Sequence, residues 1–184
     1  MATPEPNDAY ICVDVETAGP IPGDYSLLSI GACTIFEPLS TFYIELQPIN
    51  ENSTAEAARI HKLSLQQLSE EGVPPGEAMQ RFESWISCQV PQRKQAVLVA
   101  FNAAFDWMFI NYYFNHYLGH NPFGHAALDI KALYMGVTKV AWSQTSWHHI
   151  SPHYEENTDL THHALQDALD QAALFKKILK DMQP

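Results

Sequence analysis

Basic residues are scarce in this chain of 184 residues, where 10 Lys and Arg stand against 21 Asp and Glu and the formal net charge is −11. This balance argues against a basic surface for duplex DNA, because such surfaces gain affinity from counterion release by many Lys and Arg. It does not exclude nucleic acid, since a carboxylate cluster presents positive charge to a phosphate once divalent cations are bound.

Cysteine is also rare, and Cys12, Cys33 and Cys88 show neither a CxxC motif nor the spacing of a metal site. Two of them lie in apolar runs typical of buried strands, so we expect reduced thiols in the core. No stretch approaches the roughly 18 apolar residues of a membrane span. The first ten residues lack the cationic and apolar regions of a signal peptide. We therefore expect a cytoplasmic protein without membrane association.

Repeats, low-complexity segments and an interdomain linker are absent as well. The length corresponds to about one domain, and 46% hydrophobic residues place the chain outside the composition of disordered proteins. We predict a single domain over residues 1–184 with a core from about 9 to 180.

Apolar runs and turn residues predict the secondary structure of the first half. Residues 10–15, 27–36 and 41–46 are expected to form three strands of an antiparallel meander. From Ser53 to about Cys88 the apolar residues follow helical spacing.

The second half predicts an α/β arrangement, because a strand at 95–101 passes directly into an aromatic-rich helix at 103–117. Further helices are predicted at 128–136 and 161–180. No periodicity is visible between about 137 and 159, and loops of this length in a compact domain are often functional.

Two carboxylates lie at the end of the first strand. Side chains of a strand alternate between faces, so Asp14 and Glu16 project from the same face. Unpaired buried charges are costly, and Mg²⁺ or Mn²⁺ with oxygen ligands would remove that cost at the carboxyl end of a central strand. The alternative is an exposed pair at a fraying strand end.

A third carboxylate, Asp106, lies where the second apolar strand passes into a helix. If the two strands are neighbours, Asp106 reaches the same rim as Asp14. The alternative is an ordinary acidic residue favoured by the helix dipole.

A fourth carboxylate, Asp167, follows a His pair at the start of the last helix, for which Asp159 or Thr161 is the expected N-cap. Histidine has an ordinary pKa of about 6.5, so His162 or His163 would suit a general base. The alternative is a solvated His pair.

Together these segments resemble the DEDD superfamily of 3′–5′ exonucleases over about residues 9 to 180. The three motifs of the superfamily appear as Asp14-Val15-Glu16-Thr17, Asn102-x-x-Phe105-Asp106 and His162-x4-Asp167. The spacing of the third motif is similar to the His-type subgroup (DEDDh). That subgroup contains the proofreading subunit of bacterial replicative DNA polymerase, ribonuclease T and oligoribonuclease-like enzymes. Supporting similarity lies in Ser29-Ile30-Gly31-Ala32 and Ala58-Arg59-Ile60-His61.

The resemblance implies a ribonuclease H-like α/β fold, a five-stranded mixed sheet flanked by helices. It also implies two ions, Mg²⁺ or Mn²⁺, held by Asp14, Glu16, Asp106 and Asp167, with His162 deprotonating the attacking water. The expected activity is metal-dependent 3′–5′ hydrolysis of single-stranded or short nucleic acid, RNA or DNA, to nucleoside 5′-monophosphates.

The sequence departs from the family pattern at two points. Phe101 stands where many relatives have His, and Ala18-Gly19-Pro20 replaces the common Thr-Gly. His163 occupies the position of the Tyr in the other subgroup. We expect His162 to be the base because its spacing matches the His-type family.

The resemblance implies that Thr17 and Ala18 meet the 3′-terminal nucleotide through backbone groups, with Phe105 or Trp107 nearby. Aromatic rings stack on any base, which suits sequence-tolerant binding of single strands, although core packing is the favoured explanation for Phe105. Asn102 either binds the ligand or caps the following helix.

The long loop contains His148, His149 and His153, for which a zinc site is the less favoured hypothesis. We expect this loop to form a wall over the active site or a dimer contact.

Two other functions stay open at this point. One is a non-catalytic module that binds single-stranded nucleic acid, and the other is a phosphodiesterase acting on oligonucleotides or dinucleotides. A homodimer could supply further substrate-binding surface. The choice between RNA and DNA depends on contacts to the 2′-OH, which the sequence does not reveal.

Overall fold

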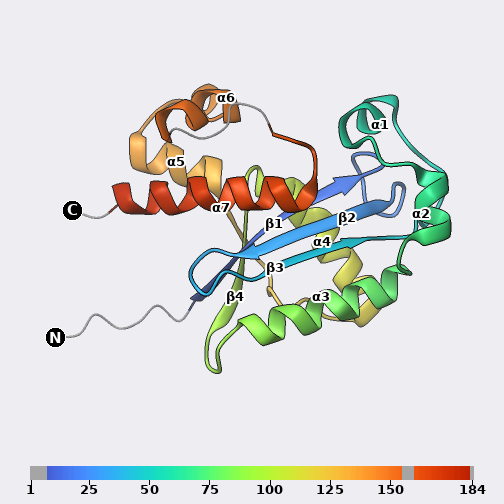
Figure 1. Ribbon diagram of the computed structural model, residues 1–184. Helices are drawn as coiled ribbons and strands as arrows, with labels where there is room; N and C mark the ends of the chain where they lie inside the picture. The colour runs from blue at the N-terminus through green and yellow to red at the C-terminus, as the bar shows by residue number, and fades with distance from the viewer. Residues whose placement is uncertain (1–7, 155–159, 183–184) are drawn as a thin grey trace.

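The computed structural model describes residues 8–154 and 160–182 (Figure 1). Five strands form a mixed sheet in the order β3-β2-β1-β4-β5. β1 pairs antiparallel with β2 and parallel with β4, while β3 pairs antiparallel with β2 and β5 parallel with β4. The predicted meander and five-stranded mixed sheet are thus confirmed. The strands are β1 (Asp8–Thr17), β2 (Leu27–Thr34), β3 (Thr41–Glu45), β4 (Gln95–Ala100) and β5 (Ala127–Asp129).

Alternation along β1 divides the core into two layers. Ile11, Val13 and Val15 pack on the side of α3 (Pro75–Gln89) and α4 (Ala103–Leu118). Cys12 packs with α5 (Ile130–Thr138) and α7 (Ala164–Asp181) on the other side, and Figure 1 shows α7 running across that face. Asp14 and Glu16 have the parity of Cys12, so they point toward the α7 side of the sheet.

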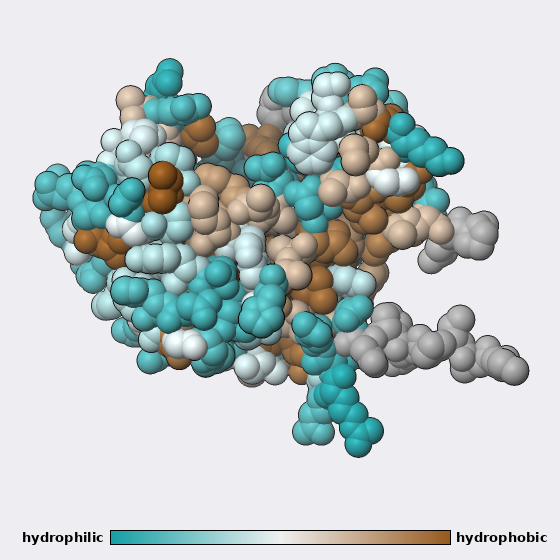
Figure 2. Space-filling model, turned by 180° about the vertical axis from the view of Figure 1, so that it is seen from behind, coloured by the Kyte–Doolittle hydropathy of each residue, from teal (hydrophilic) through white to brown (hydrophobic). Residues whose placement is uncertain are grey.

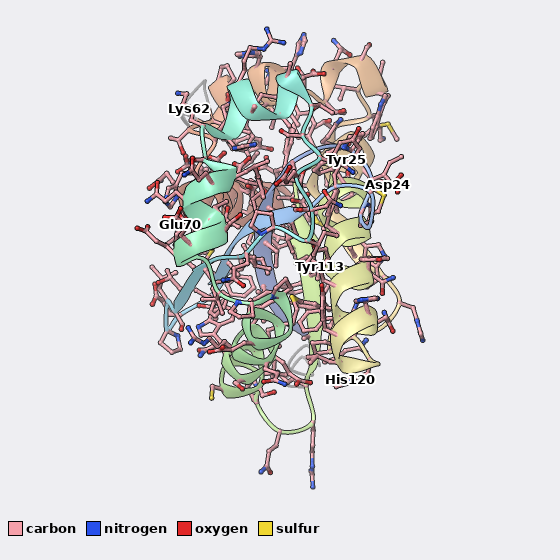
Figure 3. All side chains as sticks on the ribbon, turned by 90° about the vertical axis from the view of Figure 1, so that its right-hand side faces the viewer. Asp24, Tyr25, Lys62, Glu70, Tyr113 and His120 are labelled. Atoms are coloured by element: carbon pink, nitrogen blue, oxygen red, sulfur yellow. The ribbon has the colours of Figure 1, made fainter. Side chains whose placement is uncertain are left out.

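The α3–α4 side is tied to the sheet by a buried tyrosine. Tyr113 of α4 lies between its helix and the sheet (Figure 3), and its hydroxyl oxygen accepts the Leu27 N–H at 2.8 Å. This bond fixes α4, and with it the position of Asp106, against the start of β2.

The start of α7 rests directly on β2 at Gly31. A Cβ atom at this glycine would lie 2.1 Å from the carbonyl carbon of Ala164 and 2.2 Å from the nitrogen of Leu165. Any side chain would therefore collide with backbone. The glycine allows the N-terminal turn of α7, which carries Asp167, to approach the sheet closely.

Two short helices follow β3 and form a separate lobe at the carboxyl end of β1 (Figure 1). In α1 (Ala55–His61) the Thr54 side chain caps the first turn, and in α2 (Leu65–Glu71) the Ser64 side chain does the same. Both residues are favoured N-caps because a hydroxyl oxygen accepts an otherwise unpaired backbone N–H.

The predicted helix at 128–136 was wrong at its start. The structure has the strand β5 there before α5 begins, and three residues are too few to show a strand pattern. The Asp129 side chain caps α5 by accepting the Ala132 N–H at 2.7 Å.

The predicted long loop contains more regular structure than expected, namely η1 (Trp142–Gln144), α6 (Trp147–Ile150) and η2 (Ser151–Tyr154). Trp147 and Ile150 are buried and hold this segment on the α5–α7 layer. Residues 155–159 lie outside the described part of the chain.

The last helix begins three residues later than predicted, at Ala164, with His163 at the N-cap position. The predicted cap Thr161 instead donates to Asp167, and the other predicted cap, Asp159, lies outside the described residues. Cys12 and Cys33 are buried free thiols as expected, and Cys88 is exposed. Within residues 8–154 and 160–182, no helix has the length and apolar character needed to cross a membrane.

Candidate active site

The carboxyl end of β1 and the first turn of α4 bring two motifs together. Asp106 is buried, and its Oδ1 atom accepts the backbone N–H of Val15 at 3.1 Å. Since Val15 lies between Asp14 and Glu16, this bond places the Asp106 carboxylate beside both of them. The pairing of β1 with β4 is what makes the contact possible.

Asp167 arrives from the opposite layer and organises the turn that leads into α7. Its Oδ1 atom accepts the backbone N–H and the hydroxyl of Thr161, both at 2.8 Å. Its Oδ2 atom accepts the N–H of His162 at 3.0 Å. Two of these bonds take up the backbone N–H groups of Thr161 and His162, which holds the chain in a turn until the helix begins at Ala164.

His162 lies at the rim of this cluster. A ring nitrogen of His162 and carboxylate oxygens of Glu16 and Asp167 all lie within 4.8 Å of one another. The residue adopts a left-handed backbone conformation with φ 56°, which is uncommon outside glycine and costs roughly 1 kcal/mol. The turn held by Asp167 maintains this conformation and keeps the imidazole at the carboxylates.

The neighbouring His163 has different contacts. Its ring stacks on Tyr43 of β3, with centroids 4.6 Å apart and an interplanar angle of 19°. The Tyr43 hydroxyl donates to Glu45 at 2.7 Å. His163 does not line the pocket described below, so of the two histidines His162 is the one brought to the carboxylates.

Burial and mutual repulsion raise the pKa of three of the carboxylates, Asp14, Glu16 and Asp106. Burial raises the pKa of Asp14 well above its usual range, and repulsion from Asp106, Glu16 and Asp167 adds to the effect. Burial and repulsion from Asp167 raise the pKa of Glu16 to about 7. Burial raises the pKa of Asp106 to about 8, although the Val15 N–H bond opposes the shift.

No Lys or Arg within the described ranges forms an ion pair with any of these four carboxylates. Crowded oxygen donors without a cationic partner are the donor set that hard divalent cations prefer. The residues therefore fit a metal centre of the kind that Asp14, Glu16, Asp106 and Asp167 were predicted to form.

Gln171 supports the cluster and was not predicted from the sequence. Its Nε2 atom donates to Asp14 Oδ1 at 2.7 Å, and its Oε1 atom accepts the Phe101 N–H at 2.9 Å. The available signal was its position one turn after Asp167 on the same helix face, since residues four apart are neighbours on a helix.

A pocket of about 460 Å³ extends from the carboxylates toward α1. Figure 2 shows the surface hollowed between the lobe of α1 and that of α5–α6. Of the residues predicted to bind substrate, Thr17 and Phe105 line the pocket, whereas Ala18, Asn102 and Trp107 do not.

The three residues that do not line the pocket have other surroundings. Ala18 is fully buried, and Trp107 packs against the core on the α3–α4 side. Asn102 is exposed and left-handed, and its side chain makes no capping bond. The Ala103 N–H donates instead to Asp129 at 2.6 Å, so the capping alternative for Asn102 was wrong.

The α1 segment supplies pocket walls that the site prediction missed, namely Thr54, Glu56, Ala57, Ile60 and His61. The signal was the family-like Ala58-Arg59-Ile60-His61 segment. Within residues 8–154 and 160–182, Glu16, His162 and Asp167 are the group of His, Cys, Asp and Glu spaced to hold a metal. His148, His149 and His153 are not part of that group.

Comparisons with known proteins agree with this arrangement. The family model described as the 3′-5′ exoribonuclease Rv2179c-like domain matches residues 9–179. The 3′-5′ DNA exonuclease Cap18 of Escherichia coli is 49% identical over 173 residues, which cover 94% of this chain and 92% of that protein.

Solved structures share the fold at low sequence identity. The nuclease domain of 3′hExo, a DEDDh family member bound to rAMP, has a TM-score of 0.77 at 16% identity and is matched over 95% of this chain and 92% of that one. Exonuclease I has a TM-score of 0.74 at 16% identity, over 96% of this chain and 42% of that one.

The family match and the 49% identical relative define a 3′–5′ exonuclease, a hydrolase that acts on nucleic acids, and its fold is shared with a DEDDh family member. The chain belongs to the 3′-5′ exoribonuclease Rv2179c-like domain family.

Proposed function

We propose that this protein removes nucleotides one at a time from the 3′ end of single-stranded DNA and releases nucleoside 5′-monophosphates. The observation that carries the proposal is the set of four carboxylates and His162 at one end of a pocket. DNA is favoured because the 49% identical relative is a DNA exonuclease. RNA is the alternative because the family description is that of an exoribonuclease.

Asp14, Glu16, Asp106 and Asp167 would hold two ions, Mg²⁺ or Mn²⁺. Ions bound at such a site lower the pKa of the attacking water and stabilise the charge on the attacking and leaving oxygens.

The side chains around the carboxylates orient the reactants. His162 takes the proton of the attacking water, because its imidazole is within reach of the carboxylates and is held there by the Asp167 turn. Gln171 fixes the orientation of Asp14 through the 2.7 Å bond to Oδ1. Thr17, Ile60 and Phe105 form walls for the terminal nucleotide, in a pocket with the volume of a small-molecule site.

The test uses 5′-labelled single-stranded DNA and RNA of the same sequence with Mg²⁺, Mn²⁺ or EDTA. We expect stepwise shortening from the 3′ end, faster on DNA, that is lost with EDTA and with Asp14→Asn. His162→Ala should lower kcat by about 10²- to 10⁴-fold, the usual contribution of a general base, and leave metal affinity nearly intact. His163→Phe is the matched control because it keeps a ring on Tyr43.

Three results would contradict the proposal. Absence of cleavage with either metal would favour a binding module. Cleavage restricted to dinucleotides would favour a small phosphodiesterase. Full activity of Asp14→Asn would refute the site.

A further inference from the structure

An exposed aromatic ring and a lysine form a patch beside the candidate active site. Trp142 of η1 is 53% exposed. The Lys131 Nζ atom lies 4.5 Å from the centroid of the Trp142 ring and 5.9 Å from that of Phe101. We call Trp142 and Lys131 the Trp142 patch. Trp is enriched at binding interfaces, where its large apolar ring and polar N–H can both find partners.

The Trp142 patch lies at the same edge of the sheet as the carboxylates. Phe101, beneath Lys131, directly follows β4 at its carboxyl end. The Phe101 N–H is bonded to Gln171, and Gln171 is bonded to Asp14. Two hydrogen bonds and one side chain therefore connect the floor of the patch with the candidate metal centre.

The Trp142 patch and the pocket lie on opposite sides of the carboxylates. The pocket extends toward α1, after β3, whereas Lys131 and Trp142 belong to the α5–η1 segment that follows β5. Figure 1 shows α1 and the α5–α6 lobe apart, with the start of α7 between them. β3 and β5 are the two edges of the sheet, and β1 is its centre.

This arrangement has a consequence for a strand cut at its 3′ end. If the terminal nucleotide occupies the pocket and its phosphate lies at the carboxylates, the next nucleotide must leave on the side away from α1. An aromatic ring with an adjacent cation suits that nucleotide, because the ring stacks on any base and the cation pairs with a phosphate. A local cation matters in a chain with a net charge of −11.

We propose that Trp142 and Lys131 bind the nucleotides on the 5′ side of the scissile phosphate, Trp142 by stacking on a base and Lys131 by contacting a phosphate. The proposal rests on the exonuclease function proposed above. It gives the long segment after α5 a role in substrate binding rather than in chemistry.

The test compares a substrate that barely extends beyond the scissile phosphate with substrates that continue past it. In the methyl ester of thymidine 5′-monophosphate only a methoxy leaving group lies on the far side of the phosphate, whereas oligodeoxythymidylates of 2 to 12 nucleotides place nucleotides there. Trp142→Ala should raise KM for the longer oligonucleotides about 5- to 100-fold, as expected for loss of one stacked base. The KM for the methyl ester should stay unchanged. Trp142→Phe, which keeps a ring, should restore most of the affinity.

Lys131→Gln should raise KM for the same oligonucleotides and lower the slope of log KM against log salt by about 0.7, the value for one phosphate contact on a single strand. Phe36→Ala and Lys180→Gln are the matched controls. Phe36 is also 53% exposed but follows β2, and Lys180 lies in the last turn of α7, at the opposite end from Asp167.

The proposal is overturned if the two variants match their controls at every chain length, or if Trp142→Ala impairs the methyl ester and the oligonucleotides equally. Failure of the wild-type protein to cleave either substrate would overturn the proposed function instead. In that case the Kd for labelled dT12, measured by fluorescence anisotropy, tests the Trp142 patch. The proposal requires weaker binding by Trp142→Ala than by Phe36→Ala.

Discussion

Replacing Asp106 by Asn should stabilise the metal-free protein while it abolishes cleavage. The carboxyl of Asp106 has a pKa of about 8 in the folded protein, against an ordinary value of 3.8 in the unfolded chain. The folded state therefore binds the proton more tightly, and the wild-type protein loses stability as the pH rises from about 4 to 8. Asn can still accept the Val15 N–H through its carbonyl oxygen and carries no charge.

The upper bound on the gain follows from the difference between the two pKa values, about 8 and 3.8, which corresponds to about 6 kcal/mol. As a guide, replacing a buried ion pair by well-packed hydrophobic residues of similar volume is neutral or gains about 1–4 kcal/mol, and we take the same range for the loss of this buried charge. For a protein of this length each kcal/mol raises Tm by roughly 2–4 °C. We therefore expect a Tm increase of roughly 2–16 °C above pH 8 and a much smaller one near pH 4.

The assay is urea and thermal unfolding in EDTA between pH 4 and 9. Asp24→Asn is the control, because Asp24 is exposed in the turn before β2 (Figure 3) and does not line the pocket at the carboxylates. Mg²⁺ or Mn²⁺ should stabilise the wild-type protein more than Asp106→Asn. The reasoning is refuted if Asp106→Asn is no more stable than the wild type at pH 9, or if the difference between them does not depend on pH.

Three further substitutions test the supports of the site. Gly31→Ala should destabilise the protein by about 3 kcal/mol or more, as overpacking against backbone does, because the added Cβ meets Ala164; urea unfolding measures this, and an unchanged midpoint would contradict it. Tyr43 stacks on His163 and so supports the turn that presents His162. Tyr43→Ala should therefore lower kcat about 3- to 10-fold at unchanged KM, the effect of a stacking contact worth about 1 kcal/mol, and Tyr43→Phe should stay near wild type. If Tyr43→Ala causes a further loss in a His162→Ala background, Tyr43 does not act through His162. Gln171→Leu should lower the free energy of unfolding by about 1–3 kcal/mol, because the partly buried Phe101 N–H loses its acceptor. It should also weaken Mn²⁺ binding in a calorimetric titration, and intact binding would argue against orientation of Asp14 by Gln171.

The sequence predicted those parts of the fold that depend on local pattern. The apolar runs of β1, β2 and β4 are long enough to identify strands, and alternation alone places Asp14 and Glu16 on one face. β5 was missed because three residues are too few to show the alternation of apolar and polar side chains that identifies a strand. The late start of α7 was missed because it depends on the Asp167 carboxylate, whose bonds to Thr161 and His162 do not appear in a hydrophobic pattern.

The carboxylates of the candidate site were predicted from the sequence, but most of the pocket wall was not. The proximity of Asp106 to Asp14 was stated as conditional on neighbouring strands, and the β1–β4 pairing meets that condition. Ala18, Asn102 and Trp107 were chosen for their place beside the motifs, yet the pocket wall comes from α1, which only the tertiary fold brings there. A homodimer and a cytoplasmic location stay predictions.

The hydrogen bonds of Asp167 affect how its variants must be interpreted. Removal of this carboxylate takes away a candidate oxygen ligand and also opens the turn that presents His162, so a loss of rate could not be divided between the two causes. Asp167→Asn would also disturb the turn. In the wild type the two carboxylate oxygens accept the N–H groups of Thr161 and His162, whereas the NH₂ group of Asn can only donate and would face one of these N–H groups. Among the residues that the structure describes, Asp14 makes no hydrogen bond to the turn that carries His162, so the effect of its substitution on the rate measures the loss of a metal ligand more directly.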